Sequence, residues 1–139
     1  MQRQALNRQC LAAALAVAAT AVLVPSAIGA GTGQTQYPTS FTKFKYEVSG
    51  GEATFEGKID SDKSGCIPDR KVKLYRKKSG DEKKLGGDKT NNKGKFSIDV
   101  GTPPLKDGTY YSEVEQAKIG SSGNKKTCLA KTSGSVKLS

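Results

Sequence analysis

Apolar and polar residues alternate along most of the chain after residue 40. In the segment 53–60, every second residue from Ala53 and Phe55 onward is apolar or small, and the residues between them are polar. The same period of two recurs in the segments 41–48, 71–75, 95–100, 110–114 and 128–138. This period is typical of β-strands with one buried face and one hydrated face.

Short runs of turn-forming residues separate these segments at intervals of roughly 8–12 residues, a spacing typical of a β-sandwich or barrel. The runs include Ser49-Gly50-Gly51, Ser64-Gly65, Ser79-Gly80, Gly86-Gly87, Asn91-Asn92, Asp107-Gly108 and Ser121-Ser122-Gly123. No segment after residue 30 keeps a helical period, and short turns join antiparallel strands. We therefore expect an all-β fold, a single antiparallel β-sandwich of about seven strands.

The N-terminal region has a different pattern. A polar start with Arg3 and Arg8 precedes an apolar run over 10–24, and mostly small residues follow over 27–30. This order is that of a secretory signal peptide. The apolar run is shorter than the about 20 residues that a membrane-spanning helix needs. We predict a signal peptide over residues 1–30 and a secreted, extracellular protein, with an uncleaved N-terminal anchor as the alternative.

The remaining chain is the length of one domain. Residues 31–40 consist mainly of Gly, Thr, Gln and Ser, so a flexible lead-in is expected there. The β-sandwich domain is predicted over residues 41–139, and no transmembrane segment is expected after signal cleavage. Loss of Arg3 and Arg8 with the signal peptide reduces the formal net charge from +10 to +8.

Two of the three cysteines, Cys66 and Cys128, lie outside the predicted signal peptide. An even pair in an exported protein predicts a disulfide. Closing a loop of about 60 residues would stabilise the fold by roughly 4 kcal/mol. The alternative is a free or metal-binding pair, but the sequence contains no histidine to complete a zinc site.

The segment 104–110 allows two structural interpretations. It resembles a tyrosine corner, in which the hydroxyl of a tyrosine such as Tyr110 bonds back to the backbone a few residues upstream. The alternative is an ordinary turn at Asp107-Gly108 followed by a core tyrosine. Both give the segment a structural role.

The ordered segments also carry a family resemblance. They read FEGKI (55–59), RKVKLYR (70–76), TNNKGKF (90–96), GTYYSEV (108–114) and SVKL (135–138). Their order and spacing resemble a bacterial secreted prealbumin-like or carboxypeptidase-regulatory-like (immunoglobulin-like) β-sandwich, although Asn91 stands where that group usually has Asp. Cys66 and Cys128 make the chain similar to a disulfide-bearing subset. The resemblance implies a small module that binds or braces, with no catalytic motif to carry over.

The residues that catalysis needs are scarce. Without histidine, no Ser–His or Cys–His pair can form. Glu113 and Glu115 share one side of a predicted strand, and a glycosidase needs two carboxylates about 5–10 Å apart across a cleft. Solvated acids beside lysines are the simpler interpretation, so we expect no enzyme.

One segment has the opening of a calcium loop. Residues 60–65 read D-x-D-x-S-G, but Lys71 occupies the position of the bidentate glutamate. We interpret the segment as an acidic turn and expect neither a metal site nor a cofactor.

Basic residues gather around one predicted turn. These candidate anionic-surface residues are Arg70, Lys71, Lys73, Arg76, Lys77, Lys78, Lys83 and Lys84. Such a patch attracts anionic polymers in a salt-sensitive way. Alternatively, the lysines keep the domain soluble and protect its edge strands. Tyr75 is the only aromatic residue among them, which disfavours a specific nucleic-acid partner.

The favoured function is therefore a secreted, non-catalytic binding or structural β-sandwich module. The first alternative is a basic module that docks on anionic cell-surface polymers or lipids, and a small secreted hydrolase is the second. The partner is expected to be an anionic extracellular polymer or another cell-surface protein.

Overall fold

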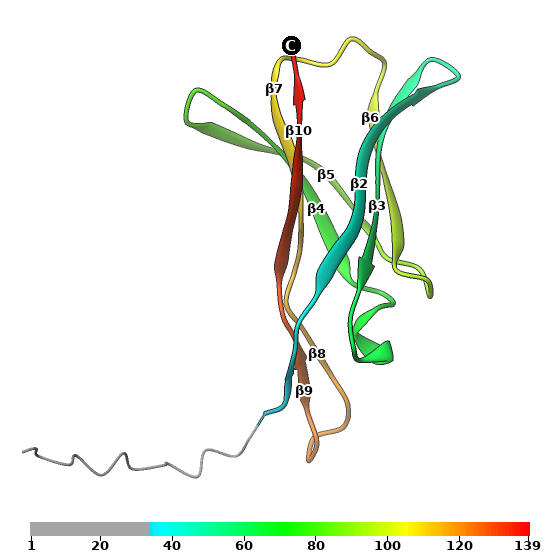
Figure 1. The fold of residues 1–139 in the computed structure, drawn as a ribbon, viewed down its shortest axis with the longest axis vertical. Coiled ribbons are helices and arrows are strands. Elements are labelled where there is room, and N and C mark those ends of the chain that lie inside the picture. The colour runs from blue at the N-terminus through cyan, green and yellow to red at the C-terminus, as the bar shows by residue number, and fades with distance from the viewer. Residues whose placement is uncertain (1–33) are drawn as a thin grey trace, which may run out of the picture. The chain divides into compact units, whose positions relative to one another are not determined.

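The computed structural model describes residues 34–139, and the predicted signal peptide lies outside this part of the chain. Ten strands and one short 3₁₀ helix are described: β1 (Gln36–Tyr37), β2 (Ser40–Ser49), β3 (Glu52–Asp60), η1 (Ser64–Cys66), β4 (Lys71–Lys78), β5 (Asp81–Lys89), β6 (Lys95–Gly101), β7 (Gly108–Val114), β8 (Ala117–Ile119), β9 (Lys126–Cys128) and β10 (Lys131–Leu138) (Figure 1). The all-β prediction is confirmed. Between residues 34 and 139, no helix has the length and apolar character to cross a bilayer.

The strands form three sheets. One has the order β2-β3-β6, a second β10-β7-β4-β5, and a small third sheet β1-β9-β8. Neighbouring strands are antiparallel except β1 and β9. The two larger sheets together contain seven strands, and β2 lies beside β10 where these sheets meet (Figure 1). This arrangement is compatible with a β-sandwich.

The core contains side chains from both larger sheets. Its buried members are Phe55, Ile59, Val72, Leu74, Phe96, Ile98, Tyr110 and Val114. The ring of Phe55 on β3 stacks on Tyr110 of β7 with centroids 5.0 Å apart. All eight occupy inward positions of the alternating pattern, and each such buried side chain contributes about 1.5–3 kcal/mol. The alternation of apolar and polar residues therefore predicted correctly which face of these strands is buried.

Strand β5 is absent from the sequence prediction, which treated Gly86-Gly87 as a turn. In the structure both glycines belong to β5 and pair with β4. A side chain at Gly87 would place its Cβ 2.7 Å from the carbonyl oxygen of Val72. The glycines thus permit close packing within a strand. The two larger sheets contain seven strands including β5, and the three strands of the small sheet bring the described total to ten.

The predicted flexible lead-in over residues 31–40 differs from the structure where the structure describes it. Residues Gln36–Tyr37 form β1, which pairs with β9, and β2 begins at Ser40. The amide of Leu129 donates a hydrogen bond of 2.9 Å to the carbonyl of Tyr37. Backbone groups supply this pairing, so a search for apolar periodicity does not detect it.

The segment before β7 is a tyrosine corner. The Tyr110 hydroxyl donates a hydrogen bond to the backbone carbonyl of Lys106, four residues upstream. The side chain of Leu105 packs against the core beside it. This bond decides between the two interpretations of the segment and fixes the loop between β6 and β7.

Candidate functional site

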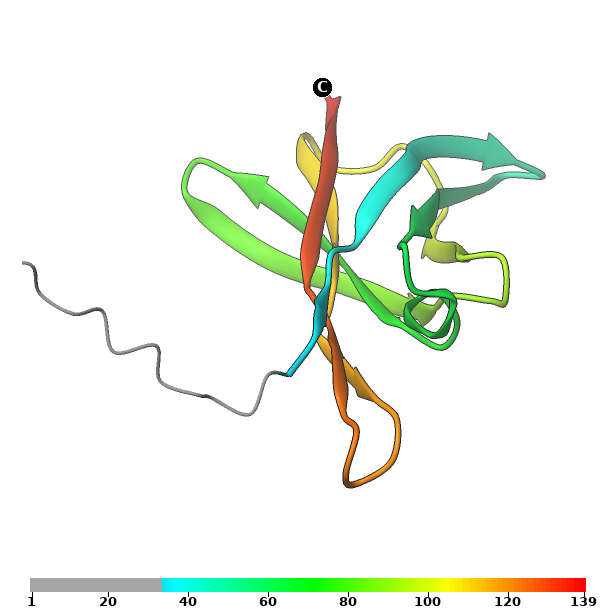
Figure 2. The same cartoon turned by 60° about the horizontal axis from the view of Figure 1, so that its bottom comes forward.

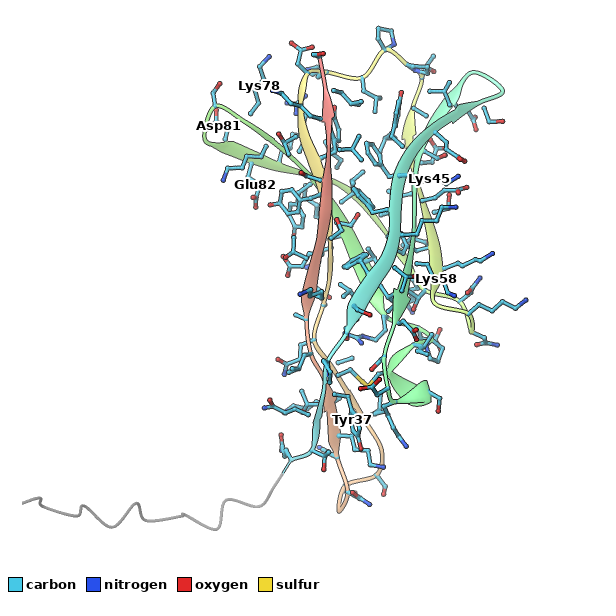
Figure 3. The ribbon with its side chains drawn as sticks, viewed as in Figure 1. Tyr37, Lys45, Lys58, Lys78, Asp81 and Glu82 are labelled. Atoms are coloured by element: carbon cyan, nitrogen blue, oxygen red, sulfur yellow. A yellow bond between two sulfur atoms is a disulfide. The ribbon has the colours of Figure 1, made fainter. Side chains whose placement is uncertain are left out.

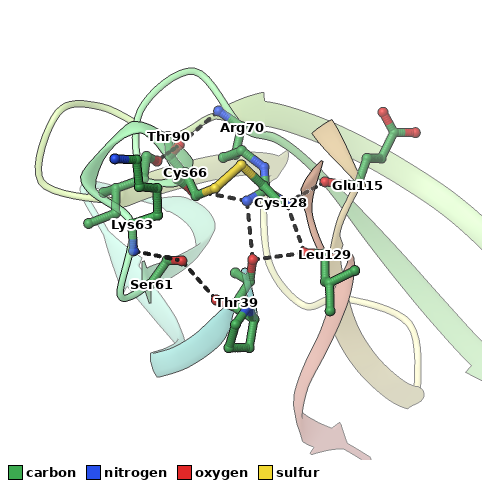
Figure 4. Close-up of a disulfide and its surroundings, with 11 residues drawn as sticks. Thr39, Ser61, Lys63, Cys66, Arg70, Thr90, Glu115, Cys128 and Leu129 are labelled. Carbon is green, nitrogen blue, oxygen red and sulfur yellow. Dashed lines mark hydrogen bonds between the residues drawn. A yellow bond between two sulfur atoms is a disulfide. The ribbon is translucent and has the colours of Figure 1, made fainter. Parts of the chain in front are cut away.

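The predicted disulfide joins Cys66 of η1 to Cys128 at the end of β9 (Figure 4). The two Cα atoms lie 5.4 Å apart, and both cysteines are fully buried. The bond connects the loop before β4 to the small sheet. The sequence prediction of this pairing is confirmed.

Arg70 does not belong to a surface patch, contrary to the sequence prediction, because it is only 1% exposed. Its Nη1 donates to the carbonyl of Cys66 at 2.9 Å and to Oγ1 of Thr39 at 3.1 Å. Its Nη2 donates to the carbonyls of Glu115 and Leu129 at 2.6 and 3.0 Å (Figure 4). Burial lowers the pKa of Arg70 from its ordinary value. The guanidinium therefore joins four chain segments beside the disulfide.

The seven other residues of the predicted patch lie on two faces of the β4–β5 hairpin, whose tip extends beyond the neighbouring strands (Figure 2). Opposite residues of an antiparallel pair share a face. Lys84 opposes Tyr75, and Lys83 opposes Arg76. The outer face of the sheet therefore carries Lys71, Lys73, Lys77 and Lys84, whereas the other face carries Arg76, Lys78 and Lys83. Because side chains alternate between the two faces along a strand, the residues of the predicted patch are divided between both faces.

Acidic side chains neutralise part of the outer face. Lys73 forms an ion pair with Glu115 and lies opposite Glu113. The hydrogen bond between the paired side chains raises the pKa of Lys73 and lowers the pKa of Glu115. Lys77 lies opposite Glu82. The two glutamates considered as a carboxylate pair thus flank a lysine on this face.

The outer face also holds an aromatic pair that the sequence analysis missed. Tyr111 on β7 stacks on Tyr75 of β4, with centroids 5.5 Å apart and an interplanar angle of 20°. The Tyr111 hydroxyl donates a hydrogen bond to Glu82, which raises the pKa of Tyr111 to about 12. These rings come together because β4 pairs with β7. The sequence of the β4–β5 segment alone therefore could not predict the pair.

A larger concentration of unneutralised charge lies over β2, β3, β5 and β6. A hollow of about 430 Å³ is lined by four lysines, which we call the lysine hollow: Lys43, Lys58, Lys89 and Lys95. In Figure 3, Lys58 points away from the core, on the opposite side of the molecule from Lys78 and Glu82. None of the four was among the predicted site residues. They are far apart in sequence, and strand pairing alone assembles them.

The two acids that line the lysine hollow already have partners. Glu56 pairs with Lys45, which is outside the hollow, at 3.3 Å. The carboxylate of Asp88 accepts hydrogen bonds from the amides of Ser97 at 2.9 Å and Lys89 at 2.7 Å. Within residues 34–139, no ion pair involves any of the four lysines of the hollow. The hollow therefore has an excess of positive charge.

The charge of Lys43 is itself disfavoured by its neighbours. The positive field of Lys45 is the main cause that lowers the pKa of Lys43. Glu56 opposes this effect in part, and Lys95 adds a still smaller lowering effect. An anion entering the hollow would reduce this repulsion. The electrostatics therefore favour a negatively charged ligand.

The turn after β5 positions Lys95 at the hollow. Oδ1 of Asn91 accepts hydrogen bonds from the amides of Lys93 at 2.9 Å and Lys95 at 3.0 Å. Gly94 has a φ of +77°, which favours glycine, and its carbonyl accepts the Ile59 amide at 2.9 Å. Asn91 therefore closes this hairpin, although the family that the sequence resembles usually has Asp at this position.

Two side chains of the acidic segment 60–65, Asp60 and Ser61, form hydrogen bonds within the chain. Oδ1 of Asp60 accepts the Ser61 amide at 2.9 Å, and the Ser61 hydroxyl donates to the carbonyl of Pro38 at 2.8 Å. Over residues 34–139, no group of three or more histidine, cysteine or acidic side chains is arranged to hold a metal ion. These contacts fit the acidic-turn interpretation.

The geometry thus provides a disulfide-linked end, a partly neutralised outer face and the lysine hollow. The structure supports an all-β fold of three sheets that is compatible with a β-sandwich. No model of a known protein family matches the sequence, and neither a curated protein nor a solved structure matches the chain.

Proposed function

We propose that the chain is a secreted, non-catalytic module that binds an anionic extracellular polymer through the lysine hollow. In this proposal residues 1–30 are removed on export, and the domain is a single immunoglobulin-like or prealbumin-like sandwich. The observation that carries the proposal is the group of four lysines without an acidic partner in the described chain.

A polymer suits this hollow better than a single small anion. Two opposite unit charges about 4 Å apart gain about 1 kcal/mol in water, which gives little affinity alone. Once one charge of a polymer is bound, its next charges meet the remaining lysines as intramolecular contacts. The four lysines, each on a different strand, can therefore bind a polymer with repeated negative charges, although a single lysine would bind one such charge only weakly.

The lining favours charge recognition over base stacking. Phe96 is the only aromatic residue that lines the lysine hollow, and it is 4% exposed. Single-stranded nucleic acids are held by exposed aromatic platforms together with a basic groove. We therefore favour an acidic polysaccharide or a phosphate-containing surface polymer over nucleic acid.

We propose a non-catalytic protein because of the side chains that the sequence contains and lacks. The sequence has no histidine, and the candidate carboxylates Glu113 and Glu115 lie beside Lys73. A general acid needs a carboxyl with a raised pKa, whereas Lys73 lowers the pKa of Glu115. These facts count against the alternative of a small hydrolase.

Chromatography on a sulfated polysaccharide and on an uncharged dextran tests the proposal with the oxidised, secreted protein. We expect retention on the sulfated matrix alone, with elution as salt screens the contacts. The double substitution Lys58→Gln and Lys95→Gln should weaken binding about tenfold, because two contacts of about 0.7 kcal/mol are lost.

The matched control removes the same charge from the outer face by Lys77→Gln and Lys84→Gln, neither of which lines the lysine hollow. This variant should elute at nearly the salt concentration of the unsubstituted protein. Equal losses in the two double variants, or retention that is insensitive to salt, would contradict binding at the lysine hollow.

A further inference from the structure

A second hollow, of about 210 Å³, lies at the end of the domain where β6 leads into β7. Its apolar wall contains Leu85, Val100, Leu105 and Tyr110, and its basic wall contains Arg76, Lys83 and Lys106. We call it the end hollow. In Figure 1 the β6–β7 loop lies at the opposite end of the domain from β8 and β9, so this site is separate from the disulfide.

The carbon chain of Arg76 lies against Gly108, and within residues 34–139 its guanidinium has neither a hydrogen-bond nor an ion-pair partner. A Cβ added to Gly108 would lie 3.0 Å from Cγ of Arg76, so the glycine makes room for this side chain. Nε of Arg76 is buried without a hydrogen-bond partner. In the part of the chain that the structure describes, Arg76 forms no ion pair. Its Nη donors therefore have no acceptor among residues 34–139.

Lys106 is brought to the same place by the tyrosine corner, since Tyr110 bonds to its backbone carbonyl. A neighbouring hollow is lined by Arg76, Lys78, Lys106 and Asp107. Asp107 is paired with Lys78 at 3.2 Å. Arg76 and Lys106 thus line both hollows, and the only acid there already has a cationic partner.

We infer that the end hollow binds a small organic anion with an apolar body and a carboxylate or similar terminal group. The guanidinium of Arg76 can bind a carboxylate through two parallel hydrogen bonds. Leu85, Val100 and Leu105 would cover the apolar body. The volume is below the about 300 Å³ of ordinary drug-sized sites, so the ligand is the size of one ring or a short acyl chain.

This inference is independent of polymer binding at the lysine hollow. The two hollows share no lining residue. A small ligand with an apolar body also differs in chemistry from a hydrated polyanion. Loss of one activity in a variant should therefore leave the other unchanged.

Titration of the ¹⁵N-labelled, oxidised protein with three probes tests the inference. Benzoate has both the charge and the apolar body, benzyl alcohol lacks the charge, and acetate lacks the ring. Benzoate should give saturable amide shifts centred on Leu105, Lys106 and Tyr110. The two other probes should bind at least about tenfold more weakly, because each lacks one of the two contributions. Equal binding of benzyl alcohol and benzoate would overturn the role of the cations.

A pair of adjacent residues supplies the matched variants. Arg76→Gln should weaken benzoate binding about tenfold, whereas Lys77→Gln, on the other face of β4, should leave it within about twofold. Lys83→Gln is an exposed second variant that should weaken binding severalfold without disturbing the core. Benzoate affinity unchanged in both Arg76→Gln and Lys83→Gln, or no saturation by about 10 mM, would overturn the proposal.

Discussion

Two arginines on the same side of β4 differ in how the protein uses them. Arg70, just before the strand, donates four hydrogen bonds to groups from four chain segments. Arg76, six residues later, has no ion-pair partner within residues 34–139 and lines a hollow. The Nε atoms of both arginines are buried without a hydrogen-bond partner, so the two differ in the partners of their Nη atoms. At the disulfide end both Nη atoms of the arginine have protein acceptors, and at the other end the Nη atoms of Arg76 have none among the described residues.

This difference distinguishes a charged side chain that stabilises the fold from one that is available to a ligand. A buried charged group is stable only where hydrogen bonds replace its hydration, as the acceptors around Arg70 do. A half-buried arginine whose Nη donors have no protein acceptor can donate them to the carboxylate of a ligand. The number of protein acceptors around a cation is therefore a better guide to its role than its place in a basic sequence.

The largest effect is expected from removing the disulfide at the Arg70 end. The double substitution Cys66→Ser and Cys128→Ser should lower the free energy of unfolding by about 4 kcal/mol, because the unfolded chain regains the entropy of a long loop. Urea denaturation of both proteins measures this loss. A change below about 1 kcal/mol would mean that the disulfide does not constrain this end.

The comparison is sharpened by the same substitution at both arginines. Arg70→Met should cost about 3 kcal/mol, since four acceptors lose their donor and only part of this cost is offset by removing a buried charge. Arg76→Met should cost less than about 1 kcal/mol, because no protein group loses a partner. Urea denaturation again gives both values. Equal costs would contradict the distinction between the two ends.

A smaller effect is expected in the tyrosine corner that supports the Arg76 end. Tyr110→Phe removes the hydrogen bond to Lys106 and should lower the free energy of unfolding by about 1 kcal/mol. Tyr75→Phe is the matched control, because no hydrogen bond of its hydroxyl is present within residues 34–139. If both substitutions had the same effect, the corner bond would have no stabilising role.

The smallest effect on stability is expected at the exposed contact of Tyr111 with Glu82. The raised pKa of Tyr111, about 12 against an ordinary 10.0, means that the folded state keeps the phenolic proton. The contribution of this hydrogen bond to the free energy of unfolding is complete below pH 10 and is lost as the pH rises through about 12. Glu82→Gln should return the pKa of Tyr111 toward 10 while changing stability at pH 7 by only a few tenths of a kcal/mol. Ultraviolet titration of the phenolate gives the pKa, and an unchanged value in Glu82→Gln would contradict this contact.

The sequence predicted the parts of the fold that depend on local alternation. Residues such as Phe55, Leu74 and Ile98 are buried as their period required. The Cys66–Cys128 disulfide also followed from composition and the predicted export signal. Strand β5 was missed because its glycines have the composition of a turn, and their role depends on contacts with β4.

The candidate sites were predicted less well, because they depend on which strands become neighbours. The basic run over 70–84 indicated one patch, yet Arg70 is buried and the rest occupy two faces. The lysine hollow combines isolated lysines from four strands. Its only sequence signal is a set of outward lysine positions such as Lys58 and Lys95, which acquire meaning once β3 pairs with β6.

One measurement compares the two arginines directly. Arg70 and Arg76 are the only arginines in residues 31–139, so the ¹H–¹⁵N spectrum of a protein that consists of these residues should contain two arginine Nε signals. During a benzoate titration the Arg76 signal should move saturably while the Arg70 signal stays in place. A shift of the Arg70 signal, or no saturable shift of the Arg76 signal, would contradict the conclusion that only the second arginine is available to a ligand.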